Sequence, residues 1–144
     1  MKMSDVPSEQ LIIKTIKTAS MEELIQLYKE AEWWQPSYDY DPEFLNYIVK
    51  DSAIFVGAFL DKKLIGMGRA LSDLASDAYI QDIAVLKEFR SKGIGKKIIQ
   101  TLIEKLKENN VDWIGLVAQP GTSSFYKELG FEILKNHVPL KYKG

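Results

Sequence analysis

The stretch FRSKGIG places Arg90, Gly93 and Gly95 directly before a strongly amphipathic segment. Two glycines at a helix start weaken the helix by roughly 1 kcal/mol each relative to alanine, so this position must need bare backbone. A helix N-terminus exposes unpaired N–H groups and the positive end of the helix dipole, and glycine lets that backbone approach an anion closely. Arg90 and Lys92 add cationic donors. The pattern indicates a cradle for a pyrophosphate group.

The same spacing has a structural alternative, because Gly93 and Gly95 could simply make a tight turn from a strand into a helix. The loop lacks the Gly-Lys-Ser/Thr of a Walker phosphate loop and the three glycines of a dinucleotide-binding fingerprint. On spacing alone, phosphate binding and a tight turn both stay open.

The composition of the 144 residues removes several kinds of site. The chain has no cysteine and one histidine, His137, which excludes disulfides, zinc–thiolate sites, cysteine nucleophiles and histidine-rich metal sites. We therefore expect no metal. The net charge of −1 also speaks against a nucleic-acid partner, for which a basic domain or stripe is typical.

The sequence shows no pattern of a membrane span or of a targeting signal. No apolar run approaches the roughly eighteen residues that a span needs, and MKMSDVPSEQ has no apolar signal core. We expect no membrane partner, and a cytoplasmic location by default.

Hydrophobic periodicity predicts one mixed α/β domain over residues 1–144. Helices are expected after the capping-box pattern at 20–23, after the Asp-Pro pair at 41–42 and after Gly93, with a short fourth helix that Gly130 ends. The predicted strands are 11–17, 53–60, 63–73, 78–86, 111–118 and 131–142. The apolar stripe of the helix after Gly93 is expected to pack on the sheet.

With these elements in place, IQDIAVLKEFRSKGIGKKIIQTLIEKL resembles motif A of the GNAT superfamily, the GCN5-related N-acetyltransferases. That motif is Gln or Arg, two residues, Gly, one residue, then Gly or Ala, and Arg90, Gly93 and Gly95 match it after a strand that ends at Val85. FYKELGFE matches a second family landmark, an aromatic-Tyr pair shortly before Gly-Phe. The two landmarks lie at the expected separation, which makes the resemblance specific.

The resemblance implies a fold and a co-substrate. The fold is a central mixed sheet of about six or seven strands, with helices on both faces and a splay between the fourth and fifth family strands. The co-substrate is acetyl-CoA, whose pyrophosphate would lie on loop amides, while its pantetheine arm would pair with the splayed strand. An amide of that strand would polarise the thioester carbonyl. The residues expected to bind acetyl-CoA are Ile83, Ala84, Val85, Arg90, Ser91, Lys92, Gly93, Ile94, Gly95, Lys96, Gln119, Ser123 and Tyr126.

Tyr126 falls on the position that many family members use as a general acid. A neutral tyrosine, with a pKa of about 10, can protonate the CoA thiolate as it leaves. The alternative is an aromatic core residue. The family pattern is broken nearby, because Gln119 and Thr122 stand where many relatives carry Asn and Ala. Gln119 is still expected to hydrogen-bond the pantetheine, and Ser123 and Ser124 could also reach it.

No residue matches the glutamate that histone-modifying relatives use as a base, because Tyr79 takes its position. Asp82 is our candidate base, acting directly or through water if burial raises its pKa. The alternative is that Asp82 is a structural partner of Arg69 or of a backbone amide. The two readings stay open together.

The resemblance places the acceptor pocket at the aromatic run WWQPSYDY, with Trp33, Trp34, Tyr38 and Tyr40. Such a lining suits an aryl amine or a cationic head, and core or dimer packing is the alternative. IGMGRALSD, AYIQDIAV and FYKELGFE together are also similar to plant and cyanobacterial arylalkylamine acetyltransferases.

The expected function is transfer of the acetyl group of acetyl-CoA to a primary amine, on a small molecule or a peptide. Direct attack in a ternary complex is expected because no cysteine can carry an acyl group. The alternatives are a non-catalytic sensor that binds acyl-CoA, and a generic nucleotide-binding loop. A homodimer is an option because family members often dimerise.

Overall fold

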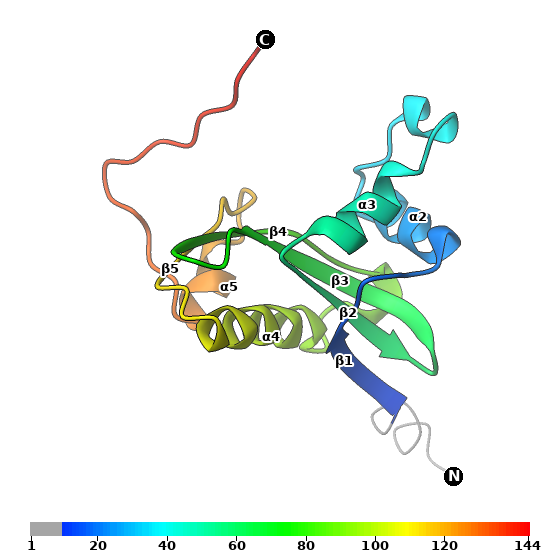
Figure 1. Ribbon diagram of the computed structural model, residues 1–144, viewed down its shortest axis with the longest axis horizontal. Coiled ribbons are helices and arrows are strands. Elements are labelled where there is room, and N and C mark those ends of the chain that lie inside the picture. Colours follow the sequence, from blue (N-terminus) through cyan, green and yellow to red (C-terminus); the bar gives the residue numbers. More distant parts are fainter. Residues whose placement is uncertain (1–9) are drawn as a thin grey trace.

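The structure is a computed structural model that describes residues 10–144, and its centre is one sheet with strand order β1-β2-β3-β4-β5 (Figure 1). β1 (Leu11–Thr15), β2 (Ile54–Leu60), β3 (Lys63–Ser72) and β4 (Asp77–Val85) pair antiparallel in that order. β5 (Trp113–Gly115) is parallel to β4. The sheet is therefore mixed, as the sequence predicts.

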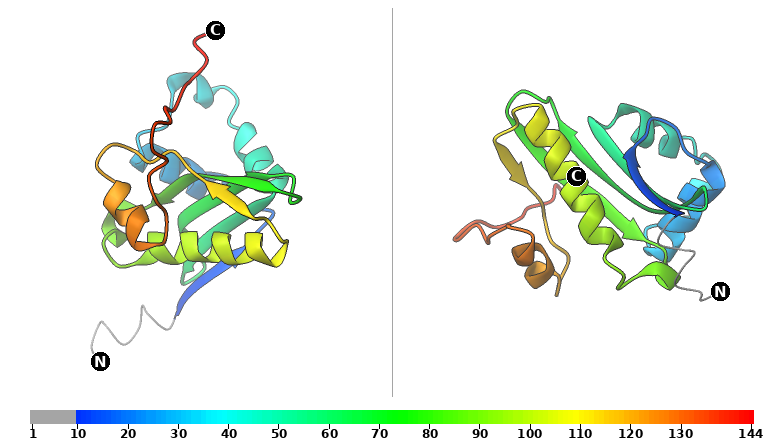
Figure 2. Two further views of the ribbon diagram at one scale, coloured as in Figure 1. Left: turned by 90° about the vertical axis from the view of Figure 1, so that its left-hand side faces the viewer. Right: turned by 90° about the horizontal axis from the view of Figure 1, so that it is seen from below.

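Helices cover both faces of this sheet. α2 (Met21–Glu30) and α3 (Phe44–Asp51) lie on one face, and α4 (Ile94–Glu108) lies on the other (Figure 2). α5 (Ser123–Glu128) is short, and two 3-10 turns, η2 (Pro36–Asp39) and η3 (Lys87–Phe89), complete the elements of the part of the chain that the structure describes. This arrangement confirms the predicted α/β fold class.

The helix starts follow their local signals closely. Ser20 Oγ accepts the amide of Glu23 at 3.3 Å, which is the predicted cap of α2. α3 begins at Phe44, later than the Asp-Pro pair suggests, because Asp41 Oδ1 accepts the amide of Glu43 at 3.3 Å and so makes a turn that leads into the helix.

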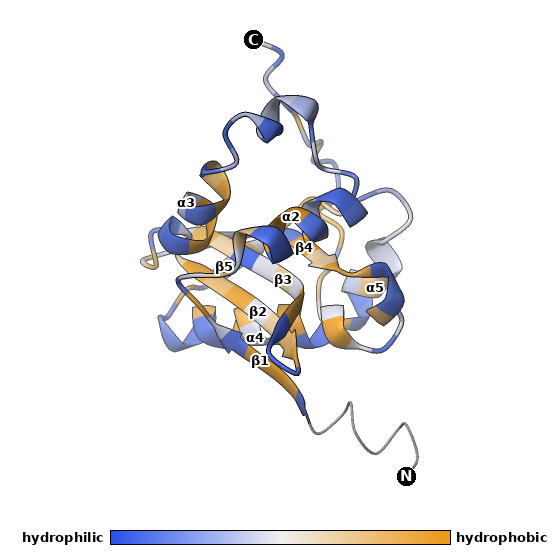
Figure 3. Ribbon diagram, turned by 90° about the vertical axis from the view of Figure 1, so that its right-hand side faces the viewer, coloured by the Kyte–Doolittle hydropathy of each residue, from blue (hydrophilic) through white to orange (hydrophobic). Residues whose placement is uncertain are grey.

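The core lies on both faces of the sheet, under α4 on one side and under α2 and α3 on the other. Ile98, Ile99 and Leu102 of α4 are fully buried, and Val56 and Ala58 of β2 are buried as well. Each such large side chain stabilises the fold by about 1.5–3 kcal/mol relative to its exposed state. Figure 3 shows mostly hydrophobic central strands and hydrophilic outward sides of the helices. The apolar stripe predicted for this helix is thus confirmed as its packing face.

The predicted strand count and two predictions near the end of the chain are wrong. Among residues 10–144 the sheet has five strands rather than six or seven, and residues 131–142 form no strand. β5 is also shorter than its predicted range of 111–118. Alternating apolar residues produce a strand only beside a partner, and here the segment after Gly130 runs away from the sheet (Figure 1).

Among residues 10–144, every helix is too short or too polar to span a lipid bilayer. The absence of a signal core was inferred from the first ten residues, and nine of these lie outside the described residues. The cytoplasmic location stays a prediction.

Candidate functional site

The parallel pair β4–β5 separates after three residue pairs. Its register ends with Tyr79 opposite Gly115, so residues 80–85 of β4 have no strand on the β5 side. On their other side Ala84 and Val85 pair with Met67 and Gly66 of β3. The predicted splay is present, and Ile83, Ala84 and Val85 lie along it.

A β-bulge turns the side chain of Asp82. The register of β3 against β4 shifts between Met67 and Arg69, and Asp82 has a φ of 57°, in the left-handed region. Arg69 Nε donates to Asp82 Oδ2 at 2.7 Å, and Arg69 Nη1 donates to Ser52 Oγ at 3.4 Å. The structural ion pair weighed in the sequence analysis is therefore formed, through one of the two carboxylate oxygens.

The glycine loop leaves backbone amides free. Gly93 is the N-cap of α4 with a φ of 81°, and no side chain caps the helix. Within the described residues, the amides of Ile94, Gly95 and Lys96 donate to no protein acceptor. These N–H bonds point out of the N-terminal end of α4, as an anion site requires.

The two glycines have different reasons to be glycine. The positive φ of Gly93 explains that residue by itself. At Gly95 a Cβ would lie 3.8 Å from Phe125 Cζ and 4.0 Å from Val85 Cγ2, which is ordinary contact, so nothing in the protein requires glycine there. A tight turn therefore explains why residue 93 is glycine but does not explain why residue 95 is. Because no contact within the protein requires glycine at residue 95, its presence there fits the close approach of a ligand to the backbone.

Arg90 is engaged by the protein itself. Its Nε donates to the Val85 carbonyl at 2.8 Å, and its Nη2 donates to the Glu30 carbonyl at 3.2 Å, at the end of α2. Glu30 Oε1 accepts the amide of Lys87 at 2.7 Å, and this hydrogen bond is the main reason why the pKa of Glu30 lies below its ordinary value. These contacts tie the loop to β4 and α2.

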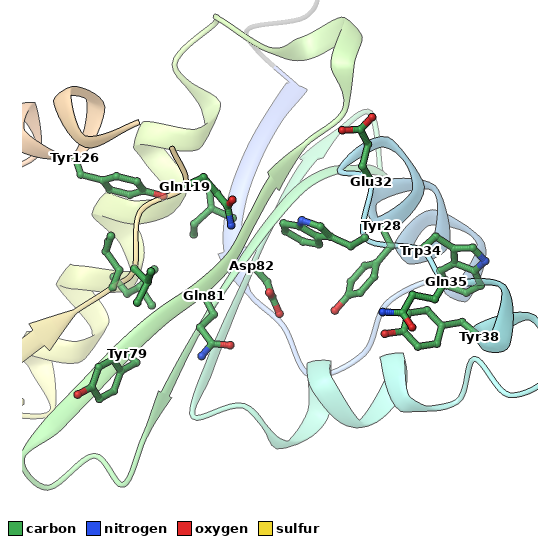
Figure 4. A pocket seen from close by; sticks show the side chains of 15 residues that line it. Tyr28, Glu32, Trp34, Gln35, Tyr38, Tyr79, Gln81, Asp82, Gln119 and Tyr126 are labelled. Carbon is green, nitrogen blue, oxygen red and sulfur yellow. The ribbon is translucent and has the colours of Figure 1, made fainter. Parts of the chain in front are cut away.

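A cavity of about 650 Å³ opens between α2, η2, β4 and the loop after β5 (Figure 4). Two carboxylates, Glu32 and Asp82, belong to its lining, and none of the lining residues is Lys, Arg or His. The predicted residues that line it are Trp33, Trp34, Tyr38, Asp82, Ile83, Gln119 and Tyr126. The lining residues that sequence reasoning missed or gave no role in the pocket are Tyr28, Glu32, Gln35, Tyr79, Ile80, Gln81, Leu116 and Val117. Tyr40 is 91% exposed and is not part of the lining.

Tyr126 packs among aromatic rings and also lines the pocket, so both interpretations of this residue stay open. Its ring packs edge to face on Phe125 and Phe131, with centroids 5.1 and 5.9 Å away. Figure 4 shows its hydroxyl pointing into the pocket beside Gln119. Burial raises the pKa of Tyr126 above its ordinary value, so that the phenol keeps its proton at neutral pH.

Tyr28 is the missed residue with the most distinctive surroundings. It is only 6% exposed and packs edge to face on Trp33 at 5.4 Å and Phe44 at 6.0 Å. Figure 4 shows its hydroxyl directed toward Asp82. Burial first, and the charge of Asp82 second, raise the pKa of Tyr28 above its ordinary value. In the sequence it is indistinguishable from a core position of an amphipathic helix.

The remaining predicted cofactor residues lie on the exposed rim. Ser91, Lys92 and Lys96 are exposed on the loop and the first turn of α4. Ser123 is exposed at the start of α5, and Thr122 Oγ1 closes the preceding turn by donating to the Gln119 carbonyl at 2.7 Å. The structure thus brings the loop amides, the splayed strand and Tyr126 to one side of the molecule.

Comparison with known proteins agrees with this geometry. The family model described as "Acetyltransferase (GNAT) family" matches residues 18–131. The "Uncharacterized N-acetyltransferase ycf52" of Pyropia yezoensis is 31% identical over 127 residues, which are 85% of this chain and 71% of that protein. "GCN5-related N-acetyltransferase 2, chloroplastic" of Arabidopsis thaliana is 42% identical over 72 residues, 50% of this chain, but only 28% of that protein.

The solved structure of the GNAT family protein SP0256 from Streptococcus pneumoniae TIGR4 shares this fold. The match has a TM-score of 0.78 at 22% identity and covers 93% of this chain and 98% of that one. At this identity the likeness speaks for the fold alone.

Proposed function

This chain belongs to the acetyltransferase (GNAT) family and is an acetyl-CoA-dependent acetyltransferase, and we propose that its acceptor is a primary amine. The amine attacks the thioester directly while both substrates are bound. The proposal rests on one observation above all. Three unpaired amides at the start of α4, one of them of a glycine that no protein contact requires, follow a strand that is free along one edge.

On the cofactor side, the proposal uses the backbone. The amides of Ile94, Gly95 and Lys96 would hold the pyrophosphate, because they combine free donors with the positive end of the helix dipole. The free edge of Ile83–Val85 would pair with the pantetheine arm as an added strand does. Acetyl-CoA then supplies an activated acyl group beside the pocket.

On the acceptor side, the proposal uses aromatic side chains and carboxylates. Trp34 packs edge to face on Tyr38 with ring centroids 5.3 Å apart, and Glu32 and Asp82 are the charged residues of the lining. Aromatic faces and carboxylates both stabilise a cation, and no Lys, Arg or His of the lining opposes one. An aryl or alkyl amine that arrives protonated fits this lining best.

The proton transfers balance through two residues. The amine nitrogen forms a bond to the acetyl carbon, the carbon–sulfur bond breaks, and Tyr126 gives its proton to the departing thiolate. The ammonium group loses one proton to Asp82, whose Oδ2 is held by Arg69, directly or through water, and the free amine then attacks. After the bond to carbon forms, the nitrogen loses a second proton, which restores the phenol of Tyr126 through water, and Asp82 releases its proton to solvent. The buried hydroxyl of Tyr28 lies on the pocket side of this carboxylate, where it can orient the amine.

The test is thiol release from acetyl-CoA with a panel of primary amines, with initial rates measured while both substrates are varied. We expect amine-dependent CoA release and intersecting double-reciprocal lines, which are the signature of a ternary complex. Parallel lines would contradict direct attack. Acetyl-CoA binding without any amine-dependent release would support the non-catalytic sensor, and stabilisation by ATP but not by CoA would support a generic nucleotide loop.

A further inference from the structure

The hydroxyl of Tyr28 is a polar group that the fold holds at the pocket without a protein partner. The side chain is 6% exposed, and among residues 10–144 no hydrogen bond engages its hydroxyl. No buried side-chain oxygen of these residues lacks a partner, so this oxygen borders the cavity rather than the closed core. Figure 4 shows it directed toward Asp82. Because buried polar groups are almost always hydrogen-bonded, a phenol placed in this way is ready for a ligand in the pocket.

Glu32 lies at a backbone position that favours glycine. Its amide donates to the Lys29 carbonyl at 3.0 Å, and the amide of Trp33 donates to the Tyr28 carbonyl at 2.9 Å. These two hydrogen bonds make a Schellman motif at the end of α2, in which Glu32 takes the left-handed position with a φ of 64°. Glycine is usual there because it has no Cβ to clash. The backbone alone would therefore not select a glutamate at residue 32.

The side chain of Glu32 gives the fold no contact that offsets this strain. In the described part of the chain its carboxylate takes part in no ion pair and no hydrogen bond, and it is exposed in the wall of the cavity. Residues that persist in such backbone conformations cluster at binding and catalytic sites, where the side chain has a use outside the fold. The use of Glu32 is to be sought in what enters the pocket.

The pocket holds two carboxylates that lie apart and still have free oxygens. Figure 4 shows Asp82 on β4 and Glu32 at the end of α2. The cations near them are engaged: Arg69 Nε pairs with Asp82 Oδ2 at 2.7 Å, and Lys29 Nζ lies over the Trp34 ring at 5.7 Å. Oδ1 of Asp82 and both oxygens of Glu32 are left for a ligand. A ligand with one positive charge can use only one of these two positions.

Aromatic rings form the wall between the two carboxylates. Tyr28 belongs to the helix that ends just before Glu32, and its hydroxyl is directed toward Asp82 (Figure 4). Its ring packs edge to face on Trp33, the residue after Glu32, with centroids 5.4 Å apart, and both residues line the cavity. Such a wall suits the methylene groups of a chain whose charged ends lie at the carboxylates.

We propose that the acceptor is a diamine, an alkyl chain with an ammonium group at each end. This inference rests on the proposed function and names the substrate class of that same pocket. Asp82 and the Tyr28 hydroxyl hold the nitrogen that reacts, and Glu32 holds the second ammonium group. Transfer joins one nitrogen to the acetyl carbon, CoA leaves as the thiol, and one proton is released in total. The second ammonium group is unchanged, so the product keeps a single positive charge.

The product predicts its own selectivity. If a monoacetylated diamine binds again with its free amine at Asp82, a neutral amide instead of an ammonium group lies at Glu32. The second transfer should therefore be slower than the first by about tenfold. Mass spectrometry of the products over time is expected to show accumulation of the monoacetylated diamine. A diacetylated product that forms as fast as the first would overturn the proposal.

The first experiment compares each diamine of three to six carbons with the monoamine in which a methyl group replaces the second ammonium. The wild-type chain is expected to favour the best diamine about tenfold in kcat/KM, and Glu32→Gln to reduce this preference to about twofold or less. Equal rates for every pair, or a higher kcat/KM for phenethylamine than for every diamine, overturn the diamine and leave an amine acceptor standing. No CoA release with any amine overturns the proposed function and this inference with it.

The second experiment uses the strained backbone as a readout that a structural role would not give. Glu32→Gly should raise the melting temperature by about 2 °C, because glycine takes this φ without strain, and should lose the preference for the diamine. Lys62→Gly is the matched control, since Lys62 is exposed with a φ of 72° and lies outside the pocket. It should be similarly stabilised and keep the preference. A Glu32→Gly chain that is less stable than wild type, or that keeps the preference, overturns the assignment of Glu32.

Discussion

The loop at the start of α4 and the aromatic pocket adjoin the same free edge of β4, but the loop offers backbone groups and the pocket offers side chains. The loop is one contiguous stretch whose donors are backbone amides of residues 94–96. The pocket is assembled from side chains of α2, η2, β4, the loop after β5 and α5. A backbone site constrains residue types through the space that a side chain would fill. A side-chain site can change its lining without changing the fold.

Tyr126 lies between the loop and the pocket, and its substitution should cause the largest loss of activity. For Tyr126→Phe we expect kcat to fall by about 100-fold or more, because the leaving thiolate loses its proton donor. The Kd for acetyl-CoA should stay within about twofold, since the ring packing is kept. Tyr142→Phe, at an exposed position, is the matched control.

The pH profile adds a second readout for the same residue. A raised pKa keeps the phenol protonated up to and beyond its ordinary value, so loss of this proton should reduce kcat only above about pH 10. Tyr126→Phe should lack that decline. A variant with unchanged kcat across the whole range would leave Tyr126 as a packing residue.

Gly95→Val should affect the cofactor side alone. The added side chain lies beside Phe125 and Val85 and covers the backbone that the ligand is proposed to approach, so we expect the Kd for CoA to rise by about 30-fold, which corresponds to ~2 kcal/mol. The melting temperature should stay the same or rise, because valine has a better helix propensity than glycine. Gln100→Val, on the exposed face of α4, controls for a β-branched residue in this helix. Unchanged binding in both variants would mean that the ligand does not approach Gly95.

The contrast between the two sides also explains what could be predicted. Gly93 and Gly95 can be recognised in the sequence because they break helix propensity at a defined spacing, and the apolar stripe of α4 follows from its period. Tyr28 cannot be recognised, since its part in the pocket depends on Asp82 of another element. The orientation of Asp82 comes from a β-bulge, and no residue type in the sequence predicts that bulge. Segment 131–142 has a strand pattern, but a pattern does not say whether a partner strand lies beside it.

Trp34→Ala should affect the acceptor side alone. We expect the KM for the amine to rise by about tenfold, because an aromatic face of the pocket is lost, with the KM for acetyl-CoA unchanged. Tyr40→Ala is the control, since Tyr40 belongs to the same segment but lies outside the pocket. Equal effects of the two changes on the amine would argue that this aromatic run serves packing rather than recognition.

Arg90→Met should have the smallest effect. Two of its donors already bind the carbonyls of Val85 and Glu30, so its main loss is in the attachment of the loop. We expect the melting temperature to fall by about 3 °C and CoA affinity to fall by less than about fivefold. A much larger loss of affinity, reversed by Arg90→Lys, would instead assign Arg90 to the phosphate as a charge.

The central claim is that acetyl-CoA is held by bare backbone, and amide NMR of the 144-residue chain during a CoA titration tests it most directly. Free donors that acquire phosphate acceptors should shift most, so the largest changes are expected at the amides of Ile94, Gly95 and Lys96, followed by Ile83–Val85. Saturable binding of CoA that leaves the amides of residues 94–96 unshifted would contradict the account.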